Sequence, residues 1–295
     1  MSALDRRGLT LAELVVTLAL LGIVTAGICR GLLTSQRTYL AQAQRVELQQ
    51  NLRAAAAILP AEFRELDAAD SDITAMSATS ITMRRTEQLG FLCVAPDVRA
   101  EGEVTLSVRQ RPLFGARSSF SAGDSVLLYV EGDPSTRSDD DWVRGQIIAA
   151  SSRDCPDPDH ARPGYELTLR LQPPGDPHPH PDVRGGVTKG SPLRGFATVT
   201  YALYSSPTDN QWYLGQRLAG ATIQPLLGPL IGPSGLALSY FDSTSRPTDM
   251  LTAVAEVEIR VRGRTALPVR ATGGGSAYVV DSLVTRVALR NNPRQ

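Results

Sequence analysis

An uninterrupted apolar run near the N-terminus, residues 9–29, constrains this chain more than any other feature of its sequence. As a helix that rises about 1.5 Å per residue, the run is about 30 Å long, enough to cross the hydrocarbon core of a bilayer. Arg6 and Arg7 precede the run, and Arg30 follows it. Because basic flanks tend to stay in the cytoplasm, we expect residues 1–8 inside the cell and the body of the chain outside the cytoplasm.

Two ordinary interpretations of this run leave one residue unexplained. A cleaved secretory signal peptide has a shorter apolar region, and Ala26-Gly27 is only a weak cleavage site for it. A plain signal anchor fits the length better. Neither interpretation accounts for Glu13. Insertion of a charged side chain into a membrane segment costs about 2.5–3.5 kcal/mol, so such a residue is taken to have a function. Glu13 therefore calls for a partner.

Glu13 closes a short segment, residues 7–13, that reads RGLTLAE. This segment resembles the cleavage and methylation signature of type IV prepilins and type II secretion pseudopilins, with Leu9 in place of the commoner Phe. The resemblance implies that a prepilin peptidase cuts between Gly8 and Leu9 and N-methylates Leu9. Glu13 then becomes the fifth residue of the mature chain, where the family keeps its glutamate. The recognition motif implied in the same way comprises Arg6, Arg7, Thr10 and Leu11.

The chemistry of these residue types suits the implied roles. Gly8 has no side chain, so a protease can approach the backbone closely. Cleavage frees an α-amine, and the resemblance implies that the Glu13 carboxylate neutralises the amine of a neighbouring subunit. Removal of one partner would leave the other buried and unpaired, which is strongly unfavourable. The implied partners are other pilin-like subunits, the prepilin peptidase and the membrane assembly platform.

A second helical segment, residues 30–67, follows the apolar run without a terminator. It is rich in Ala, Leu, Gln and Arg, which are good helix formers. We expect one apolar stripe along it to pack against a sheet. Pro60 lacks an amide donor and is expected to end or kink the helix, which can then continue through Ala61–Asp67. The expected stripe comprises Leu33, Leu40, Leu48, Leu52, Ala55 and Leu59.

From residue 70 onward the pattern changes to a period of two, which predicts strands with one wet face in a β-rich domain over residues 68–295. Pro- and Gly-rich turns separate the strands. A long N-terminal helix followed by many strands predicts an α+β fold, with the helix packed on a large antiparallel β-rich head, as in pilins. The expected strands are 80–84, 90–94, 104–110, 125–131, 143–149, 165–172, 197–204, 211–217, 236–241, 256–262 and 278–289.

The composition excludes some classes of protein and leaves the cysteines open. The chain is 42% hydrophobic and 20% charged with zero formal net charge, which indicates a globular protein and no evident nucleic-acid binder. Cys93 and Cys155 are the candidate disulfide if the body is outside the cytoplasm. Two free buried thiols are the alternative. Cys29 lies in the apolar run.

Two polar segments are candidates for metal binding, and neither is favoured. Residues 176–182, which read DPHPHPD, place His178 and His180 between two carboxylates, but in a proline-rich loop. The acidic run Asp139–Asp141 lacks the spaced oxygens of a known calcium loop. No nucleophile elbow, phosphate loop or dinucleotide fingerprint is recognisable. The sequence therefore predicts no metal, no cofactor and no enzyme.

The C-terminal pattern resembles a particular subtype of pilin. Segments 199–201, 236–241, 254–261 and 287–291 resemble the layout of PilW-type minor pilins and J-type minor pseudopilins. The implied function is a minor subunit that starts or caps a type IV pilus or a type II secretion pseudopilus. It is anchored in the inner membrane before assembly. Two alternatives stay open: a membrane-anchored binding or adhesion module that never joins a filament, and an exported enzyme on a signal anchor.

Overall fold

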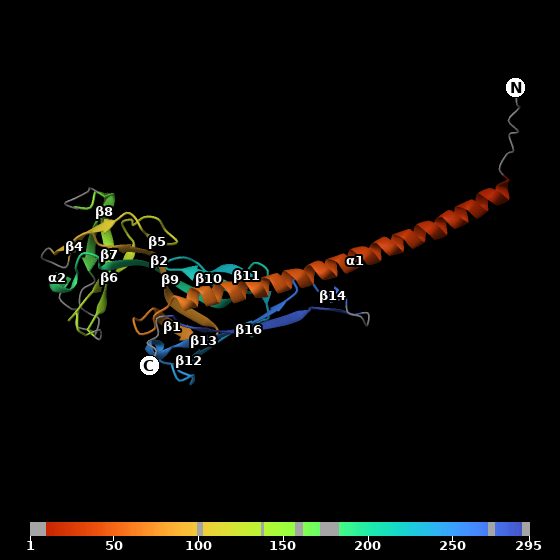
Figure 1. The fold of residues 1–295 in the computed structure, drawn as a ribbon. Coiled ribbons are helices and arrows are strands. Elements are labelled where there is room, and N and C mark those ends of the chain that lie inside the picture. Colours follow the sequence, from red (N-terminus) through yellow and green to blue (C-terminus); the bar gives the residue numbers. More distant parts are fainter. Residues whose placement is uncertain are drawn as a thin grey trace, which may run out of the picture.

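The computed structural model shows one long helix, α1 (Leu11–Arg64), that projects from a β-rich head. The N-terminal half of α1 extends away from the head, and its C-terminal half lies along it (Figure 1). All strand pairs of the head are antiparallel, so the expected α+β, pilin-like arrangement is confirmed. The structure describes residues 10–98, 103–136, 139–156, 162–171, 183–270 and 275–290.

In its described residues, the head contains strands β1 to β16 and two short helical segments. The helical segments are α2 (Val183–Gly186) and the 3-10 turn η1 (Leu251–Ala253). The strands are β1 (Ile73–Ser77), β2 (Ser80–Phe91), β3 (Asp97–Val98), β4 (Glu103–Arg109), β5 (Phe114–Gly115), β6 (Ser125–Val130), β7 (Asp141–Ser152), β8 (Gly164–Leu171), β9 (Pro192–Ser205), β10 (Trp212–Leu218), β11 (Gln224–Leu230), β12 (Leu236–Phe241), β13 (Glu256–Arg264), β14 (Val269–Arg270), β15 (Ser276–Ala277) and β16 (Val280–Ala288).

The expectation that Pro60 ends or kinks the helix with continuation to residue 67 is only partly right. Helix α1 includes Pro60, which is buried, and ends at Arg64. A proline costs one backbone hydrogen bond, but Leu59 and Phe63 on either side of it are buried in the core. Their burial stabilises the last turn, since an apolar side chain of this size gains about 1.5–3 kcal/mol on leaving water.

The expected apolar stripe on α1 is right only in its C-terminal half. Leu48, Leu52, Ala55 and Leu59 are all buried against the sheet. Leu33 and Leu40 are 52% and 62% exposed, so the expectation that they pack on the head is wrong. The head ends beside the middle of α1, where the Leu267 backbone N–H donates to Gln44 Oε1 at 3.0 Å. The sequence pattern of a helix does not reveal how far its sheet extends.

Two long strands, β2 and β9, connect two separate hydrophobic cores. Their pairing runs from Ser80 opposite Ala202 to Phe91 opposite Pro192. The chain between the last pair, residues 92–191, forms what we call the distal lobe, whose core is built from β4, β6, β7 and β8. The rest of the head, the proximal lobe, shares its core with α1. The distal lobe is therefore an insertion into a β2–β9 hairpin.

Most of the expected strands are present, with differences at β1, β2 and β11. The strand expected at 90–94 does not exist separately, because β2 continues through Gly90 to Phe91. Beyond it, Leu92 makes only an isolated bridge with Val108. The sequence pattern did not predict β1, β11 or the two-residue strands β3, β5, β14 and β15. Two prolines, Pro225 and Pro229, interrupt the β11 sequence and hide the alternation.

Candidate functional site

The N-terminus of α1 is closed by hydrogen bonds between Thr10 and Glu13. The Glu13 backbone N–H donates to Thr10 Oγ1 at 3.3 Å, and the Thr10 backbone N–H donates to Glu13 Oε2 at 3.0 Å. The Thr10 hydroxyl also donates to Glu13 Oε2 at 3.0 Å. This reciprocal pair is a capping box, which satisfies two of the backbone donors that a helix N-terminus leaves free.

Sequence reasoning identified Glu13 for its charge and missed its second role as a capping residue. The signal was present, because a threonine followed three residues later by a glutamate at the head of an apolar run is a capping-box pattern. In the first turn the carboxylate also lies at the positive end of the helix dipole. Glu13 is therefore held within its own chain, although it is exposed.

Only some of the predicted residues of this site lie within the described part of the chain, which begins at Thr10. Thr10, Leu11 and Glu13 lie together at the start of α1. Arg6, Arg7, Gly8 and Leu9 lie outside the described residues, so the cleavage site stays a prediction.

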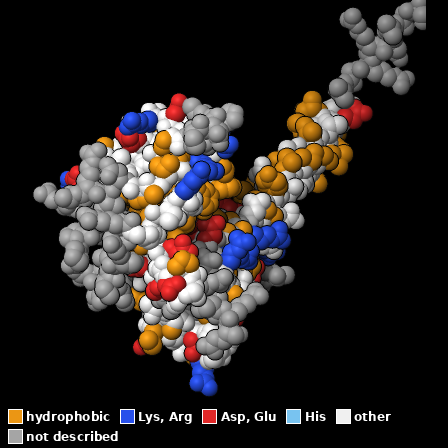
Figure 2. Space-filling model, turned by 60° about the vertical axis from the view of Figure 1, so that its left-hand side comes forward, with side chains coloured by type: hydrophobic (Ala, Val, Ile, Leu, Met, Phe, Trp, Pro, Cys, Tyr) orange, Lys and Arg blue, Asp and Glu red, His pale blue; other side chains and the backbone are white. Residues whose placement is uncertain are grey.

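The helix that follows is apolar over the length of a membrane core. Among the described residues, α1 contains the one window long and apolar enough to cross a membrane, and none of that window is buried by the head. Figure 2 shows hydrophobic side chains over the projecting part of the helix. Large residues there, such as Leu18 and Ile23, are more than half exposed. Such a surface is stable in a lipid or protein environment and not in water.

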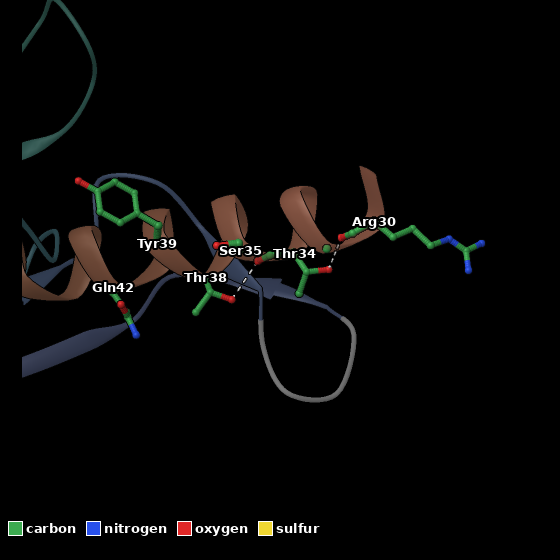
Figure 3. Close-up of a pocket in the computed structure, with 7 residues that line it drawn as sticks. Arg30, Thr34, Ser35, Thr38, Tyr39 and Gln42 are labelled. Carbon is green, nitrogen blue, oxygen red and sulfur yellow. Dashed lines mark hydrogen bonds between the residues drawn. The ribbon is translucent and has the colours of Figure 1, made fainter. Parts of the chain in front are cut away.

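A shallow groove lies on α1 just beyond the apolar run, around Thr34 and Thr38 (Figure 3). The Thr34 hydroxyl donates to the Arg30 carbonyl at 2.9 Å, and the Thr38 hydroxyl donates to the Thr34 carbonyl at 3.0 Å. Both hydroxyls are therefore satisfied within the helix. Every residue that lines the groove comes from this one helix, so the groove has no second wall and offers no enclosed site.

The two cysteines of the head lie together in the distal lobe. A disulfide joins Cys93, which follows β2, to Cys155, which lies between β7 and β8. Their Cα atoms are 5.7 Å apart, within the usual range for a disulfide. Both residues are buried. Cys29 is free and exposed on α1.

Neither candidate metal segment is supported by the described part of the chain. Asp139 and Asp140 accept hydrogen bonds from the backbone N–H groups of Asp133 and Gly132, at 2.7 and 3.2 Å. These carboxylates close a turn. Where the structure describes the chain, no group of three or more His, Cys, Asp or Glu side chains is placed to hold a metal. His178 and His180 lie outside the described residues.

Carboxylates gather where α1 gives way to β1, on the border of the two lobes. Asp72 Oδ2 accepts from the Asp67 backbone N–H at 3.0 Å and from Arg194 Nη2 at 2.9 Å. Burial, followed by the charges of Asp67 and Asp72, raises the pKa of Asp70 to about 6. Burial also raises the pKa of Asp67. This cluster was not predicted, because its arginine lies 122 residues away along the chain.

Comparison with known families agrees with the N-terminal geometry. The family described as the prokaryotic N-terminal methylation motif matches residues 4–28. No curated protein and no solved structure matches the chain. The matched segment contains the capping box and most of the apolar run.

The long apolar helix, the antiparallel head and the methylation motif support the type IV pilin-like, prepilin class for this chain. The motif indicates a substrate of prepilin peptidase, of pilin or pseudopilin type. Pilin-like proteins with this motif are structural subunits that assemble with other pilus components. The motif and the apolar part of α1 fit anchoring in the inner membrane.

Proposed function

We propose that this protein is a minor pilin or pseudopilin that initiates or caps a type IV pilus or a type II secretion pseudopilus. The observation that carries the proposal is Glu13, placed at the tip of an apolar helix that its own head leaves bare. The helix needs a lipid or protein environment, and a carboxylate in that environment needs a cation. The α-amine of a processed neighbouring subunit supplies one.

The proposed order of events begins with processing at the membrane. The peptidase removes residues 1–8 and methylates Leu9, and residues 9–29 hold the subunit in the inner membrane with residues 68–295 outside the cytoplasm. The Cys93–Cys155 disulfide supports that placement of the head, since disulfides persist in oxidising compartments. The insertion of residues 92–191 makes the head large, which favours a minor subunit at a filament tip over a repeating one. PilW-type pilins and J-type pseudopilins are the proposed subtypes.

The mass of the mature protein tests the processing step. Purified from the membrane of a cell with an active prepilin peptidase, the chain is expected to begin at N-methyl Leu9, as measured by intact-mass spectrometry. Gly8→Val should block the cut, because a side chain at that position obstructs close approach to the backbone. Retention of residues 1–8 in the unmutated protein would contradict the proposal and favour a membrane-anchored module that never joins a filament.

Substitution of Glu13 tests the assembly step separately. Glu13→Ala is expected to be cut normally and to be absent from sheared fibres, because the neighbouring amine would stay buried without its counter-charge. Quantitative immunoblotting of fibre and membrane fractions measures the ratio. Glu47→Ala, which removes an exposed carboxylate from the same helix beyond the apolar run, is the matched control and should enter fibres normally. Normal incorporation of Glu13→Ala would show that the carboxylate has no part in assembly.

A further inference from the structure

Strand β16 forms an open edge of the head. It pairs with β13 along its whole length, from Val280 opposite Arg264 to Ala288 opposite Glu256. On the other side of β13 lies β12. Within the described part of the chain, no strand pairs with the second side of β16.

The hydrogen bonds at both ends of β16 fix which of its backbone groups point outward. At one end the Leu289 N–H donates to the Ala255 carbonyl, and at the other the Thr265 N–H donates to the Val279 carbonyl, each at 2.9 Å. In an antiparallel pair, bonded and non-bonded positions alternate. The odd-numbered residues of β16 therefore bond to β13, and the even-numbered residues direct their N–H and C=O groups away from it.

The outward backbone groups are accessible. The Ser282 N–H is taken by Asp281 Oδ1 at 2.8 Å. The N–H groups of Val284, Arg286 and Ala288 have no hydrogen-bond partner among the residues that the structure describes. Val284 is 53% exposed, and Arg286 and Ala288 are exposed as well. The edge is thus a row of free donors and acceptors.

Strand β16 has few of the usual devices that keep an edge from pairing, and Asp281, which caps the Ser282 N–H, is one of them. It contains no proline, no lysine and no bulge in its register with β13. Its arginine does not guard the edge, because Arg286 is engaged by Glu256 at 3.3 Å and by Glu258 at 3.9 Å. Apart from the Ser282 N–H, which Asp281 caps, the nine-residue edge is suited to pairing with another strand.

The exposed face beside this edge has an excess of positive charge. This face carries four arginines and two glutamates, and both glutamates lie at the end near Ala288. Arg286 and Arg260 both contact Glu258, which leaves the end near Val280 basic. There the Arg264 guanidinium lies over the Tyr278 ring at 4.5 Å. The arginines of this face are Arg260, Arg262, Arg264 and Arg286.

The direction of β16 limits which partner can pair with it. The chain enters the strand near Gln44, which bonds to Leu267, and leaves it near Arg64, whose carbonyl accepts from Arg290. Strand β16 therefore runs the same way as α1 (Figure 1). A second copy that stands beside this one in the same orientation, as in the proposed filament, offers a β16 that runs parallel. An antiparallel partner, which pairs slightly better, must be a segment that runs toward the N-terminal half of α1.

We propose that β16 is a docking edge for an extended, acidic segment of a partner polypeptide, which adds to the sheet as an antiparallel strand. Main-chain hydrogen bonds to Val284, Arg286 and Ala288 give the affinity. Acidic side chains of the segment lie beside Arg262 and Arg264 and set its register. Apolar side chains that alternate with them point to the opposite face of the sheet, on the side of Leu283 and Thr285.

A designed peptide tests this directly on the full-length protein in detergent. The probe is a synthetic peptide as long as β16, with glutamate alternating with valine. Hydrogen–deuterium exchange with residue resolution is expected to show protection of the Val284, Arg286 and Ala288 amides on binding. A lysine–valine peptide and a peptide with alternate N-methyl amides are the controls, and both should bind at least about tenfold more weakly.

Two sets of variants test the backbone donor and the arginine charges separately. Val284→Pro removes a donor that has no partner among the described residues, so it should leave the melting temperature unchanged and lower peptide affinity about tenfold or more. Val284→Thr keeps the donor and should bind normally. The double variant Arg262→Glu, Arg264→Glu should reverse the preference and favour the lysine peptide. Unchanged binding in Val284→Pro, absence of protection, or self-association of the protein through β16 would each overturn the proposal.

Discussion

Arg194→Met is expected to lower the free energy of unfolding by about 3–5 kcal/mol, because it leaves the Asp72 carboxylate buried without its counter-charge. The Asp72 side chain is 0% exposed, and the Arg194 side chain is 10% exposed. Arg194 Nε also donates to Thr86 Oγ1 at 2.8 Å, so one side chain ties the start of β9 to β2 and to the segment after α1. Asp72 Oδ1 already lacks a partner, so the arginine carries most of the compensation.

The measurement is denaturant unfolding of the full-length protein in detergent, followed by circular dichroism. The double variant Asp72→Asn, Arg194→Met removes both charges and should recover part of the loss, since no unpaired charge then stays buried. Arg217→Met, which shortens an exposed arginine on β10, is the control and should change stability by less than about 0.5 kcal/mol. A loss below about 1 kcal/mol in Arg194→Met would show that water or a neighbouring group replaces the arginine.

The ion pair and the apolar helix illustrate what sequence reasoning can and cannot reach. Helix α1 was predictable because its signals are local: an apolar run, good helix formers and an ionisable residue, Glu13, inside the apolar run. The alternation that predicts β13 is equally local. The Asp72–Arg194 ion pair was not predictable from the sequence. The two residues meet only after β2 has paired with β9, and the whole distal lobe lies between these strands in the sequence. The register between two strands that are distant in the sequence produces no periodic pattern in the amino-acid sequence.

The candidate site shows the same division. Glu13 could be identified from its position alone, and its capping bonds to Thr10 could also have been found from the pattern. The exposure of Leu40 could not be predicted from the sequence, because it depends on where the sheet ends. The free edge of β16 depends on strand order, which an alternating sequence does not specify.

Joint replacement of Cys93 and Cys155 by serine is expected to destabilise the protein by about 4 kcal/mol, because the disulfide closes a long loop and limits the unfolded chain. The bond spans 62 residues and lies within the distal lobe. That lobe has its own hydrophobic core, so the loss should fall mainly there. Amides of β4 and β8 should exchange faster with deuterium, while those of β13 should change little.

The location of the effect distinguishes a local clamp from a general stabiliser. Cys29→Ser removes the free thiol on α1 and should leave both the unfolding midpoint and the exchange pattern unchanged. Thiol titration of the unreduced protein should find one reactive cysteine after denaturation. Three reactive thiols would show that the bond does not form in the cell, and equal acceleration of β8 and β13 would show that the two lobes unfold as one unit. With the distal lobe loosened and the proximal lobe intact, the double variant should still be processed at its N-terminus, because the apolar helix and its capping box do not touch the inserted lobe.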